Sequence, residues 1–288
     1  FLRDSYIMSS VLWEAVTSRQ FPDANILTKR IDDHRVHVFV PRDVNRQSPV
    51  LVMHDGKNVF FPEFATTQVS WGVLDAISNQ GIPTKKAPVV VSVWGTESDI
   101  PGARYFELAP ENVLIQEVKF WGSLLTRANL PLSNLKGNQY QSLIATKVLP
   151  GVADAIGVDL NRNRTAICGS SMGGLASIYG ASLYPDSYGT VLSLSTHWAF
   201  WNEGFIEALL ALLPEADKPR VWIDRGDLDL DVNYIGLHER AEDFLVNRGW
   251  KQGVNLNSRI FAGTGHNESA WAGRISEVIN WWLEGIPD

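Results

Sequence analysis

A short glycine-rich run contains the residue type best suited to nucleophilic chemistry. Ser171 occupies the centre of a G-x-S-x-G pattern, with Gly169 two residues before it and Gly173 two residues after it. The residues before this run predict a buried strand, and those after it predict a helix. Strand, sharp turn and helix in this order are typical of a nucleophile elbow, in which the glycines make room for a strained serine. Ser171 is therefore the candidate nucleophile, and the neighbouring Ser170 lacks the flanking glycines.

A serine hydroxyl is a weak nucleophile near neutral pH and needs a general base that an acid orients. Two histidines after Ser171 fall in predicted loops, His197 and His266. His266 follows a predicted strand and precedes a predicted helix over 270–283, where serine hydrolases with such an elbow carry the base. We therefore expect His266 to be the base. His197 follows a strand that comes too early, and we expect it at the wall of the substrate pocket.

The orienting acid should lie between these two residues, after another predicted strand. Four aspartates are available there, Asp224, Asp227, Asp229 and Asp231. Asp224 is still within the strand, whereas Asp229 lies three residues beyond a turn glycine and is the preferred candidate, followed by Asp227 and then Asp231. Alternating aspartates are also typical of a calcium loop, which requires a glycine at its sixth position and a glutamate at its twelfth. Counted from Asp227, those positions hold valine and histidine, so the calcium interpretation is weak.

Three segments of the chain, residues 50–60, 169–174 and 265–271, resemble the putative-esterase (esterase D-like, enterochelin-esterase-like) family of α/β-hydrolases. That family includes feruloyl esterases, S-formylglutathione hydrolases and mycolyltransferases. The segments occur in the family's order, and the similarity extends from about Val36 to the last predicted helix. The acid-bearing loop departs most from the family pattern, because aspartates flank the matched one on both sides.

The resemblance implies a catalytic triad of Ser171, Asp229 and His266. It also implies an oxyanion hole formed by two backbone N–H groups, those of Met172 beside the nucleophile and of Lys57 in an earlier loop. Such donors stabilise the charge that develops in a tetrahedral intermediate.

Other positions in the matched segments are expected to support the site. We expect Asp55 to brace its loop through backbone hydrogen bonds. Arg104 and Glu107 match a further family position, where an ion pair that holds the loop is expected.

Aromatic residues are the main sequence indication of substrate preference. Trp198 and Trp201 follow His197 in a segment that matches a family region near the active site. We expect these three residues to form an apolar pocket wall that favours an acyl or aryl group. Trp71 and Trp271 are expected to serve only in packing.

Length and composition agree with one α/β domain over residues 1–288. The formal net charge of −7 disfavours nucleic acid as a partner, and a small-molecule ester is the expected one. The single Cys168 excludes an internal disulfide and a thiolate metal cluster, and we expect no metal and no cofactor. No stretch is long and apolar enough to predict a transmembrane helix. The oligomeric state stays open, as does the compartment, which is either cytoplasmic or, after signal removal, periplasmic or secreted.

The pattern of elements predicts an α/β-hydrolase fold with a mostly parallel central sheet, helices on both faces and an antiparallel N-terminal edge. Parallel strands are expected at 50–53, 89–93, 165–167, 191–194 and 221–223. Helices are expected near 71–78, 140–156, 173–183, 205–213, 237–247 and 270–283. Long loops are expected at 96–114 and 129–138, over the carboxyl end of the sheet.

Three functions fit these residues. The first is a cofactor-independent carboxylic-ester hydrolase that works through an acyl-enzyme, acting on a siderophore lactone, a feruloyl or acetyl ester, or short-chain esters in general. The second is an acyltransferase that uses the same residues. The third is a non-catalytic hydrolase-like protein that only binds its ligand.

Overall fold

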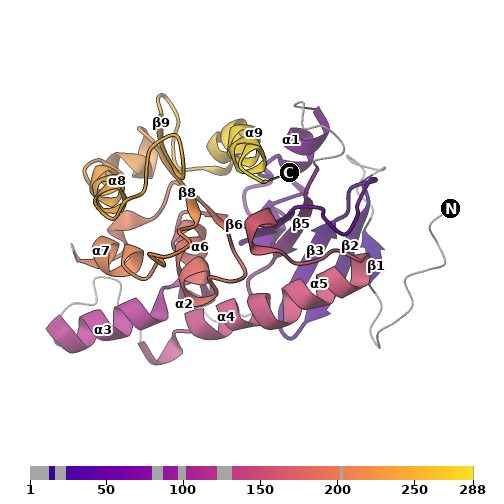
Figure 1. Cartoon of the computed structure of the whole chain (residues 1–288), viewed down its shortest axis with the longest axis horizontal. Helices are drawn as coiled ribbons and strands as arrows, with labels where there is room; N and C mark the ends of the chain where they lie inside the picture. Colours follow the sequence, from indigo (N-terminus) through magenta and orange to yellow (C-terminus); the bar gives the residue numbers. More distant parts are fainter. Residues whose placement is uncertain are drawn as a thin grey trace.

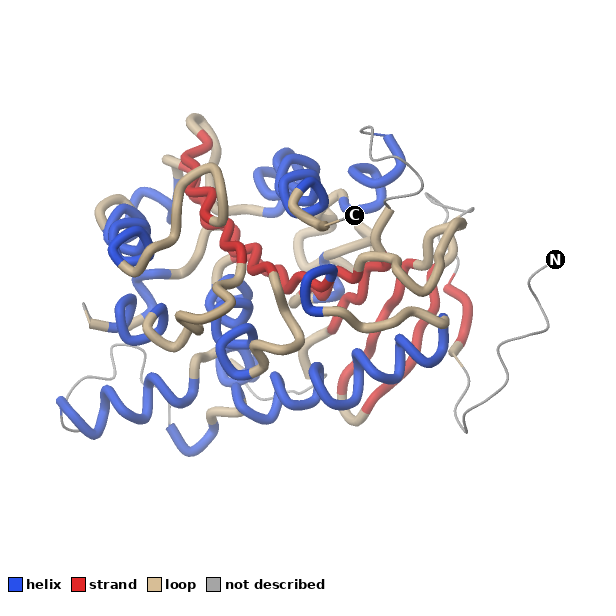
Figure 2. Tube along the Cα trace, in the orientation of Figure 1, coloured by secondary structure: helices blue, strands red, loops and turns tan. Residues whose placement is uncertain are grey.

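A single mixed sheet organises the protein. The computed structural model describes residues 13–16, 24–79, 87–96, 102–121, 132–201 and 204–287, and its sheet contains nine strands in the order β1-β2-β3-β5-β4-β6-β7-β8-β9. The pairs from β5 to β9 are parallel, whereas β1, β2 and β3 form an antiparallel edge (Figure 2). The strands are β1 (Glu14–Val16), β2 (Ile26–Ile31), β3 (His34–Phe39), β4 (Val50–Met53), β5 (Val89–Val93), β6 (Thr165–Ser170), β7 (Thr190–Leu194), β8 (Arg220–Gly226) and β9 (Leu256–Phe261). The predicted fold class is confirmed.

Both faces of the parallel strands β4 to β8 are buried, because helices cover each side, whereas the edge strand β9 exposes Arg259 and Ile260. Alternate residues point to opposite faces, so in β4 Val50 and Val52 join one apolar core while Leu51 and Met53 join the other. Figure 1 shows α1 and α9 on one side of the sheet and α3, α4 and α5 on the other. The helices are α1 (Val73–Asn79), α2 (Ala103–Leu108), α3 (Glu111–Trp121), α4 (Gly137–Leu143), α5 (Leu149–Ile156), α6 (Met172–Leu183), α7 (Phe205–Leu210), α8 (Leu237–Asn247) and α9 (Glu268–Glu284).

Two expected loops contain helices. The segment 96–114 holds α2 and the start of α3, which bury Phe106, Leu108 and Val113 in the core. The segment 129–138 contains a 3₁₀ helix, Leu132–Asn134, and the first residues of α4; residues 129–131 lie outside the described part. The expected helix over 140–156 is present as α4, a π-helical turn and α5 in succession.

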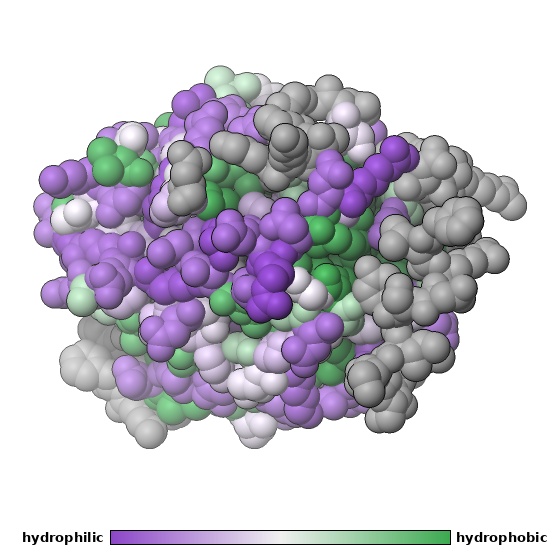
Figure 3. All heavy atoms as spheres, turned by 45° about the vertical axis from the view of Figure 1, so that its right-hand side comes forward, coloured by the Kyte–Doolittle hydropathy of each residue, from purple (hydrophilic) through white to green (hydrophobic). Residues whose placement is uncertain are grey.

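The described surface is mainly polar. On the face that Figure 3 presents, hydrophilic residues cover most of the described area and apolar residues form smaller patches among them. Among the described helices, none combines the length and apolar character required to cross a membrane.

Candidate active site

The turn between β6 and α6 has the geometry of a nucleophile elbow. Ser171 joins the two elements with φ 57° and ψ −119°, outside the regions that L-residues ordinarily adopt. A Cβ atom at Gly169 would lie 2.5 Å from the backbone of Gly173, so the turn requires a glycine there. The Ser171 N–H donates to the carbonyl of Leu194 at 2.9 Å and thereby fixes the turn on β7. The expected elbow is therefore present in the structure.

The side chain of Ser171 forms a hydrogen bond with the Tyr234 hydroxyl. Tyr234 is fully buried, and its hydroxyl also contacts His197 Nδ1 at 2.5 Å. Its ring packs edge-on against His266, with the centroids 5.6 Å apart. The sequence interpretation missed Tyr234, since a tyrosine inside an acidic loop has no distinguishing pattern.

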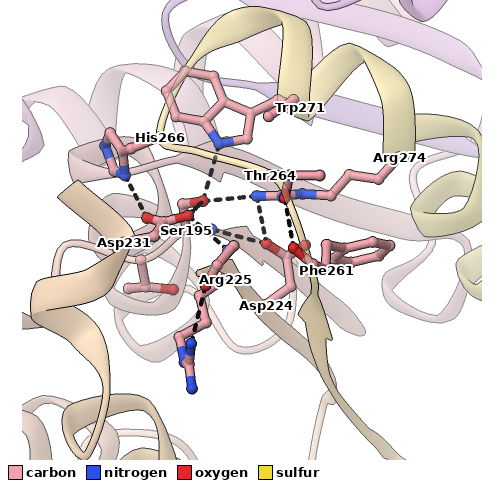
Figure 4. A network of polar contacts seen from close by, with 12 residues as sticks. Ser195, Asp224, Arg225, Asp231, Phe261, Thr264, His266, Trp271 and Arg274 are labelled. Atoms are coloured by element: carbon pink, nitrogen blue, oxygen red, sulfur yellow. Dashed lines mark hydrogen bonds and ion pairs between the residues drawn. The ribbon is translucent and has the colours of Figure 1, made fainter. Parts of the chain in front are cut away.

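His266 is paired with Asp231. Its Nδ1 lies 2.7 Å from Asp231 Oδ1, and because a carboxylate only accepts, this nitrogen carries the proton (Figure 4). The other ring nitrogen, Nε2, is thus left unprotonated in the neutral imidazole. His266 belongs to the loop between β9 and α9, where Asn267 caps the helix by accepting from the N–H of Ala270 at 3.0 Å.

The preference for Asp229 as the orienting acid needs correction. Residues 229–234 wind into a 3₁₀ helix that turns Asp231 inward beneath the end of β8 and leaves Asp229 exposed. Asp231 is 0% exposed, whereas the exposed Asp229 carboxylate accepts from the side-chain amide of Asn267 at 3.4 Å and lies against Gly265, where an added Cβ atom would be 1.8 Å from Oδ2. Asp227 accepts from the N–H of Gly263 at 2.7 Å and so links the loop after β8 to the loop after β9.

Hydrogen bonds keep the buried Asp231 carboxylate ionised. Burial alone raises the pKa of a carboxyl group, but here donors from His266, Gly226 and Ser195 more than offset it, so the pKa of Asp231 lies below its usual value. The N–H of Gly226 is 2.6 Å from Oδ2, and the Ser195 hydroxyl is 2.8 Å from the same oxygen. Both oxygens therefore have partners, and Oδ1 is left to His266.

A cavity of about 380 Å³ brings Ser171 and His266 together. Lys57 and Arg104 also line it, as does Glu268 at the start of α9. Its aromatic wall comes from Trp71 and Trp271, whose rings meet edge-on with centroids 5.8 Å apart. Both tryptophans belong to the apolar core, as expected, with 1% and 6% of their surface exposed, and they also line this cavity.

The three residues expected at the pocket wall do not line that cavity. Trp198 is 1% exposed and Trp201 is 4% exposed, and both belong to the apolar core beneath α6 and α7. His197 is half-buried against Tyr234 and Phe200. Burial, together with the nearby His266 and Arg104, lowers the pKa of His197 to about 4, so its imidazole is neutral near pH 7.

The expected oxyanion donors lie on two separate elements near Ser171. Met172 is the first residue of α6, where a backbone N–H has no acceptor within the helix. Lys57 lies in a short 3₁₀ helix, Gly56–Asn58, directly after β4, and lines the cavity. A Cβ atom at Gly56 would lie 2.7 Å from the carbonyl carbon of Val93, so this loop packs tightly against β5.

Arg104 braces the Lys57 loop from the opposite wall. Its Nε and Nη2 atoms lie 2.5 and 2.8 Å from the two carboxylate oxygens of Asp55. Asp55 therefore supports the loop in two ways: through this bidentate ion pair and, as expected, through a backbone hydrogen bond, in which its carbonyl accepts from the N–H of Asn58 at 2.9 Å. Glu107 instead accepts from the N–H of Thr96 at 3.0 Å and contacts His34 Nε2 at 3.0 Å.

The described residues contain no group of three or more His, Cys, Asp or Glu side chains arranged to hold a metal ion. Cys168 is buried in β6, and burial raises the pKa of its thiol.

Comparisons with known proteins agree with this geometry. The family model described as Putative esterase matches residues 121–281, more than half of the chain. Iron(III) enterobactin esterase of Dickeya dadantii (strain 3937) is 23% identical over 157 residues, which cover 49% of this chain and 34% of that protein. This chain thus spans about a third of the length of that curated relative.

Solved structures share the fold over most of the chain. Enterochelin esterase from Shigella flexneri superposes with a TM-score of 0.60 at 20% identity, covering 90% of this chain and 58% of that one. The BES protein from Bacillus cereus gives a TM-score of 0.65 at 15% identity, covering 96% and 99%. At these sequence identities the superpositions establish the fold alone. The family model, which matches more than half of the chain, establishes the family. The chain belongs to the putative esterase family of α/β-hydrolase-fold proteins.

Proposed function

We propose that this protein is a carboxylic-ester hydrolase that works through an acyl-enzyme on Ser171. The observation that carries the proposal is that Ser171 and His266 line the same cavity. Ser171 lies on a strained elbow, and the Nδ1 of His266 is bonded to the buried Asp231. In this arrangement Ser171 is the nucleophile, His266 the general base and Asp231 the orienting acid.

The reaction follows from the free lone pair on His266 Nε2. The Ser171 hydroxyl turns from Tyr234 toward the ester carbonyl, and its proton passes to Nε2 as the Oγ–C bond forms. The N–H groups of Met172 and Lys57 donate to the oxyanion. The imidazolium then protonates the departing alcohol as the ester C–O bond breaks, leaving an acyl-enzyme. A water molecule, deprotonated by the same imidazole, releases the acid and restores Ser171.

The cavity favours an ester with an apolar or aryl portion. The rings of Trp71 and Trp271 form part of its wall beside Ser171, with 1% and 6% of their surface exposed. The charged side chains that line it balance in sign: Lys57, Arg104, Asp55 and Glu268. The relatives with similar sequence or fold are named an iron(III) enterobactin esterase and an enterochelin esterase, so siderophore esters are a substrate class to test. The hydrolysis rates of acetyl, longer acyl, feruloyl and catecholate-lactone esters, each measured separately, would rank these substrate classes.

The decisive experiment compares three proteins on 4-nitrophenyl acetate. We expect Ser171→Ala to lower kcat by about 10⁴-fold or more, because the nucleophile is lost. Ser170→Ala is the matched control, since the neighbouring hydroxyl also lines the cavity but lies within β6. Intact mass spectrometry after rapid quenching should show an acetyl adduct that is absent from Ser171→Ala. Equal rates for wild type and Ser171→Ala would eliminate the enzymatic mechanism, and ester products formed from an added alcohol would indicate acyl transfer.

A further inference from the structure

A buried polar network connects β7, β8 and α9 behind the His266–Asp231 pair (Figure 4). At its centre is Ser195, the first residue after β7, which is 0% exposed and has φ 40°. A non-glycine residue at this φ is uncommon and persists only where surrounding contacts hold it. The network around Ser195 supplies those contacts.

The hydrogen bond from Ser195 to the acid can run in only one direction. Ser195 Oγ accepts from Arg274 Nη2 at 2.7 Å and from Trp271 Nε1 at 3.1 Å, and both of these groups are donors only. A hydroxyl has two lone pairs and one proton, so the proton is directed to Asp231 Oδ2, 2.8 Å away. A cationic donor behind the hydroxyl also polarises it and strengthens the bond to the carboxylate.

A second carboxylate holds the donors in place. Asp224 is 0% exposed and lies 2.9 Å from Arg274 Nη2, so the buried guanidinium has a counter-charge. The same carboxylate accepts from the backbone N–H of Ser195 at 3.0 Å and from Trp222 Nε1 at 2.7 Å. Ser195 is thus fixed through both its backbone and its side chain.

We propose that Ser195 is a positioning residue for His266, acting through Asp231. This inference rests on the proposed role of His266 as the general base. With the N–H of Gly226, the Ser195 hydroxyl occupies Oδ2 of Asp231, which orients Oδ1 toward His266 Nδ1 and disperses the carboxylate charge. A carboxylate with fewer hydrogen-bond donors stabilises a neighbouring imidazolium more strongly, so loss of the Ser195 hydroxyl should change both the charge that Asp231 presents to His266 and the orientation of the ring.

Two substitutions remove this hydroxyl in different ways. Ser195→Ala keeps the Cβ atom. Ser195→Gly adopts the positive φ without backbone strain, so the protein should still fold if alanine is not tolerated there. The matched control is Ser193→Ala, which removes a buried hydroxyl of β7 that bonds to Thr196 at 2.5 Å instead of Asp231. We expect both Ser195 variants to lower kcat about tenfold or more with KM within about twofold of wild type, since a hydrogen bond to a charged group is lost.

The pH dependence distinguishes positioning from a purely structural role. We expect the acid limb of the kcat profile to move upward by about half a pH unit or more in both Ser195 variants, and not in Ser193→Ala. NMR titration of isotope-labelled histidine, with the His266 signal assigned through His266→Gln, should show the same rise in the His266 pKa. This measurement needs no turnover, so it tests Ser195 even if Ser171→Ala disproves the hydrolase mechanism.

Two results would overturn the proposal. One is a His266 pKa in both Ser195 variants that equals the value in Ser193→Ala. The other is a fall in kcat that merely matches the loss of folded protein, measured by near-ultraviolet circular dichroism at the assay temperature.

Discussion

Burial separates the carboxylate that pairs with His266 from its neighbours in the loop after β8. Asp231 has three donors and no solvent contact, whereas Asp229 is exposed and lies outside the histidine loop. Only the first is bonded to the imidazole, so in the proposed mechanism it is Asp231 that holds one tautomer and offsets the positive charge formed on His266.

Asp231→Asn should therefore lower kcat by about 10⁴-fold, because an amide lets the imidazole adopt the wrong tautomer. Asp229→Asn is the matched control and should stay within about threefold of wild type, since its carboxylate is exposed and bonds to the Asn267 side chain, whereas His266 bonds to Asp231. Steady-state rates on 4-nitrophenyl acetate measure both. A larger loss in Asp229→Asn than in Asp231→Asn would reverse this assignment.

The sequence predicted the nucleophile and the histidine but not which aspartate pairs with that histidine. Ser171 and His266 stand beside glycines and element boundaries, so their positions could be predicted. Four aspartates within eight residues share one local pattern, and only the 3₁₀ turn decides which of them points inward. Trp198 and Trp201 were wrongly expected at the pocket wall for a similar reason, because an aromatic residue after a strand can belong to a core or to a pocket.

At the scale of elements, the approach of β6 to α6 gives the elbow its shape. Gly169 is the contact point, since its missing side chain lets the Gly173 backbone come close. The strand–turn–helix order could be predicted from periodicity, as could the parallel strands, whose continuous apolar runs reflect burial on both faces. The helices α2 and α3 were not predicted, because α2 has only six residues and Gly102 and Pro110, which favour a loop, flank it.

Gly169→Ala should lower the free energy of unfolding by about 2 kcal/mol or more and reduce kcat, because the new methyl group forces β6 and α6 apart. Gly151→Ala in α5 is the matched control: a Cβ there meets nothing within 4 Å, so alanine should raise stability by about 0.5–1 kcal/mol. Urea unfolding monitored by tryptophan fluorescence measures both changes. Equal stability of the two variants would contradict the steric role of Gly169.

Across the whole molecule, the two cores enclose several ionisable groups that the proposed mechanism does not use. Burial lowers the pKa of four histidines to about 4: His37, His54, His197 and His238. They lie on both sides of the sheet and near both of its ends, so their protonation opposes folding of the entire domain. In an unfolded chain each would titrate near pH 6.5.

This difference predicts a loss of stability on mild acidification. The folded-state pKa of each histidine lies below its unfolded value, so between pH 6.5 and 4 the unfolded chain binds more protons and stability falls with falling pH. At pH 5 the cost is about 1–2 kcal/mol for each fully buried histidine, relative to pH 7.5. His238 is 1% exposed, and its Nε2 lies 2.9 Å from the Ser258 hydroxyl. His238→Gln should therefore shrink the difference in unfolding free energy between pH 7.5 and pH 5 by about 1–2 kcal/mol. Urea unfolding of both proteins at the two pH values measures it, and an unchanged difference in the variant would show that His238 does not titrate in this window.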